Sequence, residues 1–329
     1  MSWRLRKLRG LYVKTRLILI LSLCLLLAIG LALFIGATSL SFNHPAFLQV
    51  RLPRVLLSAL VGLLLAISGV ILQGVLRNPL ADPYILGISA GGGVGAALSM
   101  VLGAQFVVFG ISSIPLSAFF FSLTAVYVVY RLSQVAGRTS PETLILAGVA
   151  LSAFCSAILA LIIKISGNLE AVYFWLLGSL SSANWVNVIT TLPYALAGII
   201  IAYYFSKELN ALLLGEEMAA TLGVEIEKVQ LVLIGTASLM TAAAVSVSGL
   251  IGFVGLIIPH WIRLMVGPNH RYLIPLSALS GMLLMVVADM LARVILAPLA
   301  MEIPVGVVMA LFGAPFFLYL LRRRRLEGK

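Results

Sequence analysis

Residues 17–38 read LILILSLCLLLAIGLALFIGAT, an apolar run without a charged side chain. About 20 consecutive apolar residues are enough for an α-helix to cross the hydrocarbon core of a membrane. Basic residues precede the run, as they do in a secretory signal peptide: Arg4, Arg6, Lys7, Arg9, Lys14 and Arg16. The apolar core of a signal peptide is only about 7–15 residues long, and further apolar runs follow. We therefore expect residues 17–38 to be retained as a membrane helix.

Similar runs recur along the rest of the chain, which has 329 residues, 62% of them hydrophobic and 10% charged. Soluble domains are about half apolar and a quarter charged. No stretch shows the alternating pattern of a transmembrane β-barrel strand. The sequence therefore predicts an all-α, polytopic membrane protein in which residues 1–329 form one transmembrane domain of about ten helices. Besides 17–38, the predicted spans are 55–75, 85–103, 111–131, 143–164, 188–206, 228–248, 250–266, 273–295 and 304–321.

The basic residues predict how these spans are oriented. Loops on the cytoplasmic side of a membrane are enriched in lysine and arginine. With both termini in the cytoplasm, the basic N-terminal segment 1–16 lies inside, and so do Arg77, Arg131, Arg138, Lys207, Lys228, Arg263, Arg271, Arg322, Arg323, Arg324, Arg325 and Lys329. We expect this charge, +11 overall, to act as a topology signal and to contact the lipid bilayer, and we expect no nucleic-acid partner.

Four basic residues fall on the predicted outer side: Arg51, Arg54, Lys164 and Arg293. Outer positive charge opposes the topology rule, so another interaction must favour these positions. One explanation is a carboxylate within the chain, and Asp289, four residues before Arg293, has the spacing for such a pair on a helix. The other is an external acidic partner, and the sequence leaves both open.

The longest hydrophilic segment expected on the cytoplasmic side is 207–228. Gly215 and Gly223 bracket a short helical segment in which apolar residues stand among charged ones. A solvated loop would explain the charges, but small apolar residues facing the cytosol favour docking against a partner. A second, amphipathic stretch around Tyr173 to Leu180 predicts a short helix at the outer surface.

The sequence lacks the usual marks of an enzyme or a cofactor site. Gly91-Gly92-Gly93-Val94-Gly95-Ala96 fits a dinucleotide fingerprint, but it lies inside a predicted span with no preceding strand. There is no phosphate-binding P-loop, and His44, His260 and His270 are far apart. We therefore predict no catalytic residue, metal site or cofactor, and Cys24 and Cys155 fit best as packing residues.

Several motifs resemble those of one family, the membrane-spanning permease subunits of type II ABC importers for iron siderophores, haem and vitamin B12. The resemblance covers about residues 51–321. It rests on RLPR at 51–54, QGVLRNPLADP at 73–83, LGISAG at 86–91, SGLIGFVGLIIPH at 248–260, EIPVG at 302–306 and FGAPF at 312–316. It implies ten transmembrane helices per subunit, two paired permease copies, and a separate pair of ATPase subunits that hydrolyse ATP.

The resemblance also implies roles for particular residues. Arg51, Arg54 and Arg293 would receive acidic residues of a periplasmic or lipid-anchored substrate-binding protein. Coupling to the ATPase would involve Gly215, Glu216, Ala219, Ala220, Leu222 and Gly223. A cytoplasmic gate would include Asn78, Leu80, Glu142 and Thr143, although Pro141-Glu142-Thr143 departs from the small hydroxyl residues expected there.

The function predicted from the resemblance is ATP-driven import of an iron chelate, haem or corrinoid across the inner membrane of a bacterium or archaeon, with a ferric siderophore preferred. The alternative is an ion-coupled secondary transporter of a similar substrate. That class generally carries several polar groups at bilayer depth, whereas Asp289 is the clearest acid expected there. A membrane-embedded enzyme would need clustered acids or nucleophiles, which the sequence does not show.

Overall fold

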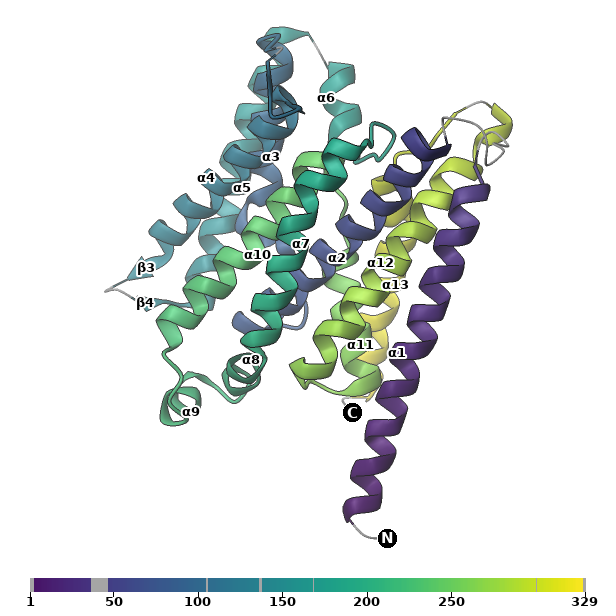
Figure 1. Ribbon diagram of the computed structural model, residues 1–329. Helices are drawn as coiled ribbons and strands as arrows, with labels where there is room; N and C mark the ends of the chain where they lie inside the picture. The colour runs from purple at the N-terminus through teal and green to yellow at the C-terminus, as the bar shows by residue number, and fades with distance from the viewer. Residues whose placement is uncertain are drawn as a thin grey trace.

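The computed structural model describes residues 3–36, 47–104, 106–135, 138–167, 169–299 and 301–327. The chain folds into a bundle of helices (Figure 1). Among the described residues, seven helices are long and apolar enough to cross a membrane: α1 (Trp3–Phe34), α2 (Leu52–Val75), α4 (Ser113–Ser133), α5 (Pro141–Ser166), α7 (Trp185–Tyr204), α10 (Ile226–Ser248) and α12 (His270–Val294). Three further helices have apolar segments of only 10–17 residues: α3 (Ile88–Val101), α11 (Val254–Val266) and α13 (Val305–Glu327).

Short elements connect these helices. The helical ones are η1 (Phe47–Arg51), η2 (Pro83–Leu86), α6 (Leu169–Leu176), α8 (Ser206–Leu212), α9 (Glu216–Thr221) and η3 (Ala297–Leu299). Two small antiparallel hairpins pair β1 (Val107–Val108) with β2 (Ile111–Ser112), and β3 (Gln134–Val135) with β4 (Arg138–Thr139).

The helices confirm the predicted all-α, polytopic character of the chain. Each of the ten predicted runs overlaps one of these helices, while the number of membrane crossings stays a prediction. Helix α1 reaches back to Trp3 and includes most of the basic segment, and residues 37 and 38 of the first predicted run lie outside the described residues, as does His44. The amphipathic stretch was predicted too late in the chain, because α6 spans Leu169–Leu176 and the left-handed backbone of Gly178 (φ 71°) follows its end.

Helix α2 forms the centre of the bundle. Its apolar window is 89% buried, against 17% for α1 and 11% for α5. Two glycines let neighbouring helices reach its backbone: a Cβ on Gly62 would lie 2.2 Å from the carbonyl oxygen of Gly281 in α12, and one on Gly69 would lie 1.9 Å from that of Gly255 in α11. Glycine at these positions therefore permits the close helix contacts expected in a membrane bundle.

Helices α10 and α11 are separated by a non-helical segment, Gly249–Phe253, whose ends have left-handed φ angles of 67° and 71°. Unwound backbone at membrane depth needs hydrogen-bond partners from the protein. The hydroxyl of Tyr84 donates to the Ile251 carbonyl and accepts from the Ile251 amide, both at 3.0 Å. The Gln73 amide donates to the carbonyls of Gly255 and Leu256 at 3.2 Å. Side chains from α2 and η2 thus hold this break in place.

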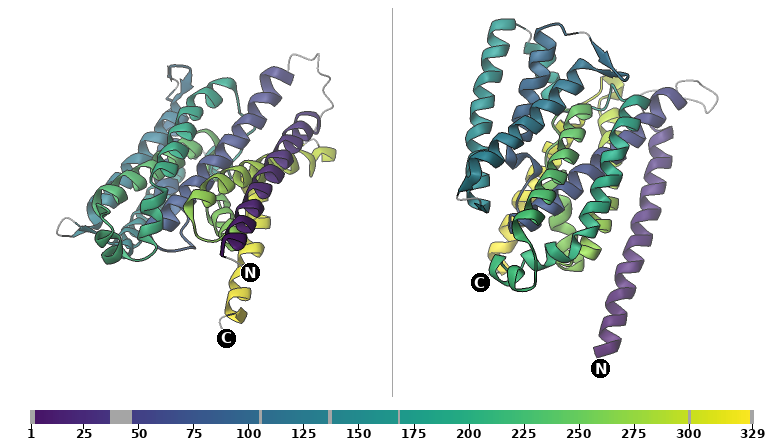
Figure 2. Two further views of the ribbon diagram at one scale, coloured as in Figure 1. Left: turned by 60° about the horizontal axis from the view of Figure 1, so that its bottom comes forward. Right: turned by 60° about the vertical axis from the view of Figure 1, so that its left-hand side comes forward.

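The two ends of the bundle differ in what they carry. Helices α8 and α9 lie at the lower end in Figure 1, where α1 begins and α13 ends, and we call this the α9 end. Helix α6 and the connection between α12 and α13 lie at the opposite end, which we call the α6 end. The two rotated views show the same arrangement (Figure 2).

Candidate functional site

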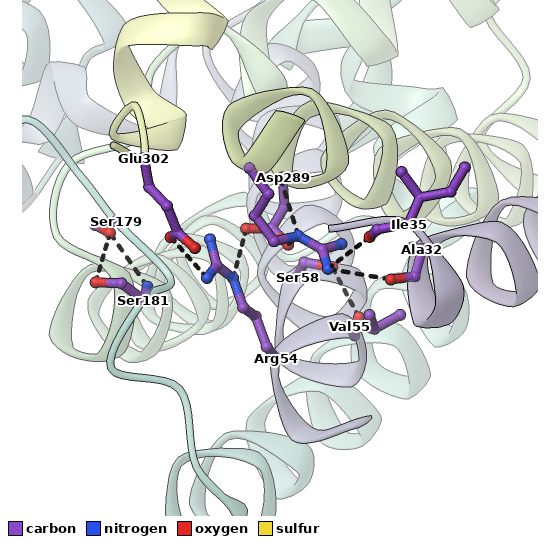
Figure 3. A network of polar contacts seen from close by, with 10 residues as sticks. Ala32, Ile35, Arg54, Val55, Ser58, Ser179, Ser181, Asp289 and Glu302 are labelled. Atoms are coloured by element: carbon purple, nitrogen blue, oxygen red, sulfur yellow. Dashed lines mark hydrogen bonds and ion pairs between the residues drawn. The ribbon is translucent and has the colours of Figure 1, made fainter. Parts of the chain in front are cut away.

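At the α6 end, ion pairs join Arg54, Asp289, Arg293 and Glu302 (Figure 3 shows their centre), and Arg51 binds the same end of α1 as Arg293 does. We call these five residues the charged cluster. Arg54, in the first turn of α2, donates from Nε to Asp289 Oδ1 at 3.0 Å and from Nη1 to Glu302 Oε2 at 2.8 Å. Asp289 lies in α12, and Glu302 lies just before α13. One guanidinium therefore joins three parts of the chain.

The other two arginines of the cluster hold the end of α1. Arg293 Nε lies 3.1 Å from Asp289 Oδ2, and Arg293 Nη1 donates to the carbonyls of Ala32 and Ile35 at 3.1 and 3.2 Å. Arg51 Nη1 donates to the carbonyls of Leu33 and Phe34, both at 3.0 Å. The last carbonyls of a helix have no partner within the helix and carry partial negative charge. The two guanidiniums supply both the hydrogen bonds and the opposite charge.

The three predicted docking arginines are therefore buried and engaged within the chain. Arg51, Arg54 and Arg293 are 6%, 8% and 3% exposed. The predicted pair of Asp289 with Arg293 is confirmed. Glu302, with a side chain 37% exposed, is the most accessible member of the ion pairs in the cluster. The sequence analysis gave Glu302 no role, because the EIPVG motif was the only feature that pointed to this residue.

At the α9 end, α9 presents apolar side chains outward. Gly215 and Gly223, with φ angles of 103° and 84°, bracket it as predicted. Leu222 is 61% exposed, and so are large apolar residues that the prediction missed, Leu214 at 65% and Met218 at 52%. Met218 lies in α9 and Leu222 is its C-terminal capping residue, four positions later and on the same side of the helix. Leu214 precedes the break at Gly215 and is placed beside them by the turn, which helical spacing in the sequence does not show.

The other predicted residues of α9 divide between its two sides. Ala220 is exposed, whereas Ala219 is fully buried and anchors α9 to the core. Glu216 points toward the bundle, because its Oε1 lies 3.2 Å from Arg77 Nη2 and accepts from the Gln230 amide at 3.4 Å.

A concave surface lies beside α9 within the predicted coupling segment 207–228 and its neighbours. It encloses a volume of about 610 Å³ between α8, the end of α7 and the start of α10. Leu222 borders it together with the charged side chains of Lys207, Glu208 and Lys228. The α9 end therefore offers both exposed apolar side chains, in and beside α9, and a hollow with charged side chains at its border.

The predicted gate residues lie in two structured turns. Asn78 Oδ1 accepts from the amide of Leu80 at 3.0 Å, which closes the turn after α2. Ser140 caps the start of α5 by accepting from the Thr143 amide at 3.2 Å, and the Thr143 hydroxyl donates to the Ser133 carbonyl at the end of α4 at 3.0 Å. Glu142 is exposed in the first turn of α5. These contacts define the turns, and a gating role for them stays a prediction.

In the described ranges, no three His, Cys, Asp or Glu side chains gather in a group that could hold a metal ion. The buried acid Asp289 is already shared by two arginines.

Comparisons with protein families, with individual relatives and with solved structures agree on the family of this chain. Residues 17–323 match the FecCD transport family. The chain belongs to the FecCD transport family. Its relatives include the cobalamin import system permease protein BtuC of Halobacterium salinarum, 45% identical over 89% of this chain and 79% of that protein. The hemin transport system permease protein HmuU of Yersinia pestis is 39% identical over 95% of this chain and 97% of its own length.

The FecCD assignment extends to the three-dimensional structure. A solved structure described as an inward-facing, metal-chelate type ABC transporter superposes with a TM-score of 0.84 at 35% sequence identity, covering 94% of this chain and 99% of that one. The resemblance inferred from the sequence motifs is thus confirmed. The relatives are transport permeases, and the multi-pass, membrane-embedded character of the family agrees with the apolar helices of this chain.

Proposed function

We propose that this chain is the membrane-spanning subunit of an ATP-driven importer for an iron chelate, haem or corrinoid. A separate ATPase subunit hydrolyses ATP, and a substrate-binding protein delivers the substrate. Membership of the FecCD family supports the transport role. The observation that carries the rest is the position of α9 and of the exposed apolar residues in and beside it, Leu214, Met218 and Leu222, at the end of the bundle opposite the charged cluster (Figure 1).

Helix α9 is the docking element for the ATPase. Leu214, Met218 and Leu222 expose large apolar side chains next to a polar hollow of about 610 Å³. Buried apolar contacts surrounded by a polar rim are typical of protein interfaces. Burial of Ala219 in the core ties α9 to the bundle, so that a force on α9 reaches the membrane helices.

The charged cluster is the docking region for the binding protein. Three arginines against two acids leave an excess of one positive charge at the α6 end. Arg54 pairs with Glu302, the most accessible acid of the cluster, so an incoming carboxylate would compete with Glu302 for this arginine. Arg51 and Arg293 hold the end of α1 and add to the positive charge that attracts an acidic partner.

The chain crosses the cytoplasmic membrane ten times, with both termini and α9 in the cytoplasm. The positions of the basic residues support this orientation. A second copy of the chain completes the pathway. Helix α5 supports such pairing, because its apolar window is only 11% buried and exposes Leu146, Phe154 and Leu161.

An ion-coupled secondary transporter is the alternative function. Proton or sodium coupling generally uses ionisable groups at the bilayer midplane. Among the described residues, the buried acid of the long helices, Asp289, is neutralised by Arg54 and Arg293, which favours the ATP-driven mechanism.

The proposed function is tested by purifying the chain with its gene neighbours. The ATPase encoded alongside should co-purify with it, and mass spectrometry of the neighbouring binding protein should detect a bound iron chelate, haem or corrinoid. A chain that purifies without an ATPase, under conditions that preserve known permease–ATPase complexes, would contradict the proposal.

A further inference from the structure

Arg77, directly after α2, has an unusual backbone conformation. Its φ angle is +49°, in the left-handed region that favours glycine. Its amide donates to the Gly74 carbonyl at 3.3 Å, and the Asn78 amide donates to the Gln73 carbonyl at 3.2 Å. Non-glycine residues in this region are uncommon and often lie at functional sites. An arginine here suggests that the side chain itself is needed.

The Arg77 guanidinium reaches across to α9. Its Nη2 lies 3.2 Å from Glu216 Oε1, and the same oxygen accepts from the Gln230 amide of α10 at 3.4 Å. The two charged side chains are 37% and 38% exposed. Ion pairs with this exposure contribute little to stability. The left-handed backbone itself is that of a helix C-cap, in which glycine is the usual residue. The weak ion pair alone therefore does not explain why arginine, and not glycine, holds this capping position.

The turn that begins at Arg77 continues into the core. Asn78 closes it through the Leu80 amide at 3.0 Å, and the Ala81 carbonyl accepts from the Gln73 amide at 3.4 Å. Gln73 also binds the first carbonyls of α11. A continuous series of ion-pair and hydrogen-bond contacts thus leads from α9, through Arg77 and the turn, to the first turn of α11.

We infer that Arg77 is a positioning residue that transmits movement of α9 to the turn 77–81 through its ion pair with Glu216. This inference rests on the proposed function, because it assigns a route for the coupling of ATP hydrolysis to transport. Energetic coupling between distant sites requires elements that move together. Burial of Ala219 ties α9 to the core, and the Arg77–Glu216 pair adds a direct contact between α9 and the turn after α2.

The first test uses the purified chain in lipid nanodiscs and measures hydrogen exchange of the α9 amides. Arg77→Gln and Glu216→Gln should each speed exchange in α9 by about two- to fivefold, the range for a half-exposed ion pair. Arg77→Gly should do the same, although glycine suits the backbone, because it lacks the guanidinium. Arg131→Gln, which removes an exposed charge from the end of α4, is the matched control and should leave α9 unchanged.

The charge-swapped double variant, Arg77→Glu with Glu216→Arg, distinguishes the ion pair from a general effect on folding. It should restore slow exchange in α9, whereas each of these single changes should speed it. Two results would contradict the link between Arg77 and α9. One is unchanged hydrogen exchange of the α9 amides in the single variants, and the other is exchange in the double variant that is as fast as in the single variants.

The second test uses proteoliposomes that contain the chain, its ATPase and its binding protein, and measures substrate imported per ATP hydrolysed. Arg77→Gln should lower this ratio about threefold or more while the ATPase still co-purifies, and the charge swap should raise it again. If the wild type takes up substrate and Arg77→Gln imports as much substrate per ATP as the wild type does, the role of Arg77 is overturned while the proposed function stands. If the wild type shows no ATP-dependent uptake, the proposed function is refuted. There is then no ATP-driven movement for Arg77 to transmit.

Discussion

Arg54 and Asp289 are 235 positions apart in the sequence, yet Arg54 Nε donates to Asp289 Oδ1 at 3.0 Å. The contact joins the first turn of α2 to α12. Asp289 also lies 3.1 Å from Arg293, so one buried carboxylate is shared by two buried guanidiniums. Removing one partner from a buried ionic network leaves uncompensated charge, which is costly.

Asp289→Asn should therefore destabilise the chain strongly. We expect a loss of about 3–5 kcal/mol in the free energy of unfolding, because both guanidiniums keep their burial and lose their shared countercharge. Glu302→Gln is the matched control and should cost less than about 1 kcal/mol, because its carboxylate is half exposed. Unfolding by detergent titration measures both variants, and equal losses would contradict the assigned role of Asp289.

Arg54→Gln should weaken association with the binding protein. We expect about a tenfold rise in Kd at low salt, since a charge-assisted hydrogen bond is replaced by a neutral one. The Kd of the wild type should rise further with salt than that of the variant, because salt screens exposed charge. Lys164→Gln removes another outer basic residue and serves as the control. A wild-type Kd for Arg54→Gln at low salt would exclude Arg54 from the interface.

Leu222→Asp should prevent recruitment of the ATPase while the chain still folds. A desolvated, unpaired carboxylate at the interface should cost about 1–3 kcal/mol of binding, and Ala220→Asp should have a similar effect. Gln134→Asp places the same group at the α9 end but outside α9 and should be neutral. Co-purification measures the three variants, and normal recovery of the ATPase with Leu222→Asp would remove α9 from the interface.

Labelling of single cysteines tests the proposed topology. In a chain with Cys24 and Cys155 replaced, Glu217→Cys in α9 should react with a membrane-impermeant reagent only from the cytosolic side. Ser181→Cys, exposed at the α6 end, should react only from outside. Glu217 is preferred over Gly215, whose φ angle of 103° would strain a cysteine. Labelling of both positions from the same side would contradict the ten-span arrangement.

Hydropathy located the helices because membrane helices are specified by local composition. The short helix α6 was misplaced because its end depends on the left-handed turn at Gly178, where a Cβ would lie 2.3 Å from the Leu250 carbonyl oxygen. The sequence predicted a boundary between α10 and α11 but not the non-helical break itself. The break depends on hydrogen bonds to Tyr84, which is far away in the sequence. Contacts of this kind are not visible in local patterns.

The charged cluster shows the same limit. The pair of Asp289 and Arg293 could be predicted from helical spacing, whereas the bond between Arg54 and Glu302 joins residues 248 positions apart. On α9, the bracketing glycines were predicted correctly. The inward position of Ala219 was not, because it depends on how the helix packs against the core.

Uptake by proteoliposomes is the most direct test of the central claim. Vesicles containing the chain, its ATPase and its loaded binding protein should import substrate when ATP is present, and an ionophore that collapses the proton and sodium gradients should leave the rate unchanged. Removal of ATP should abolish uptake. Import that continues without ATP and stops with the ionophore would contradict the account and establish ion-coupled transport instead.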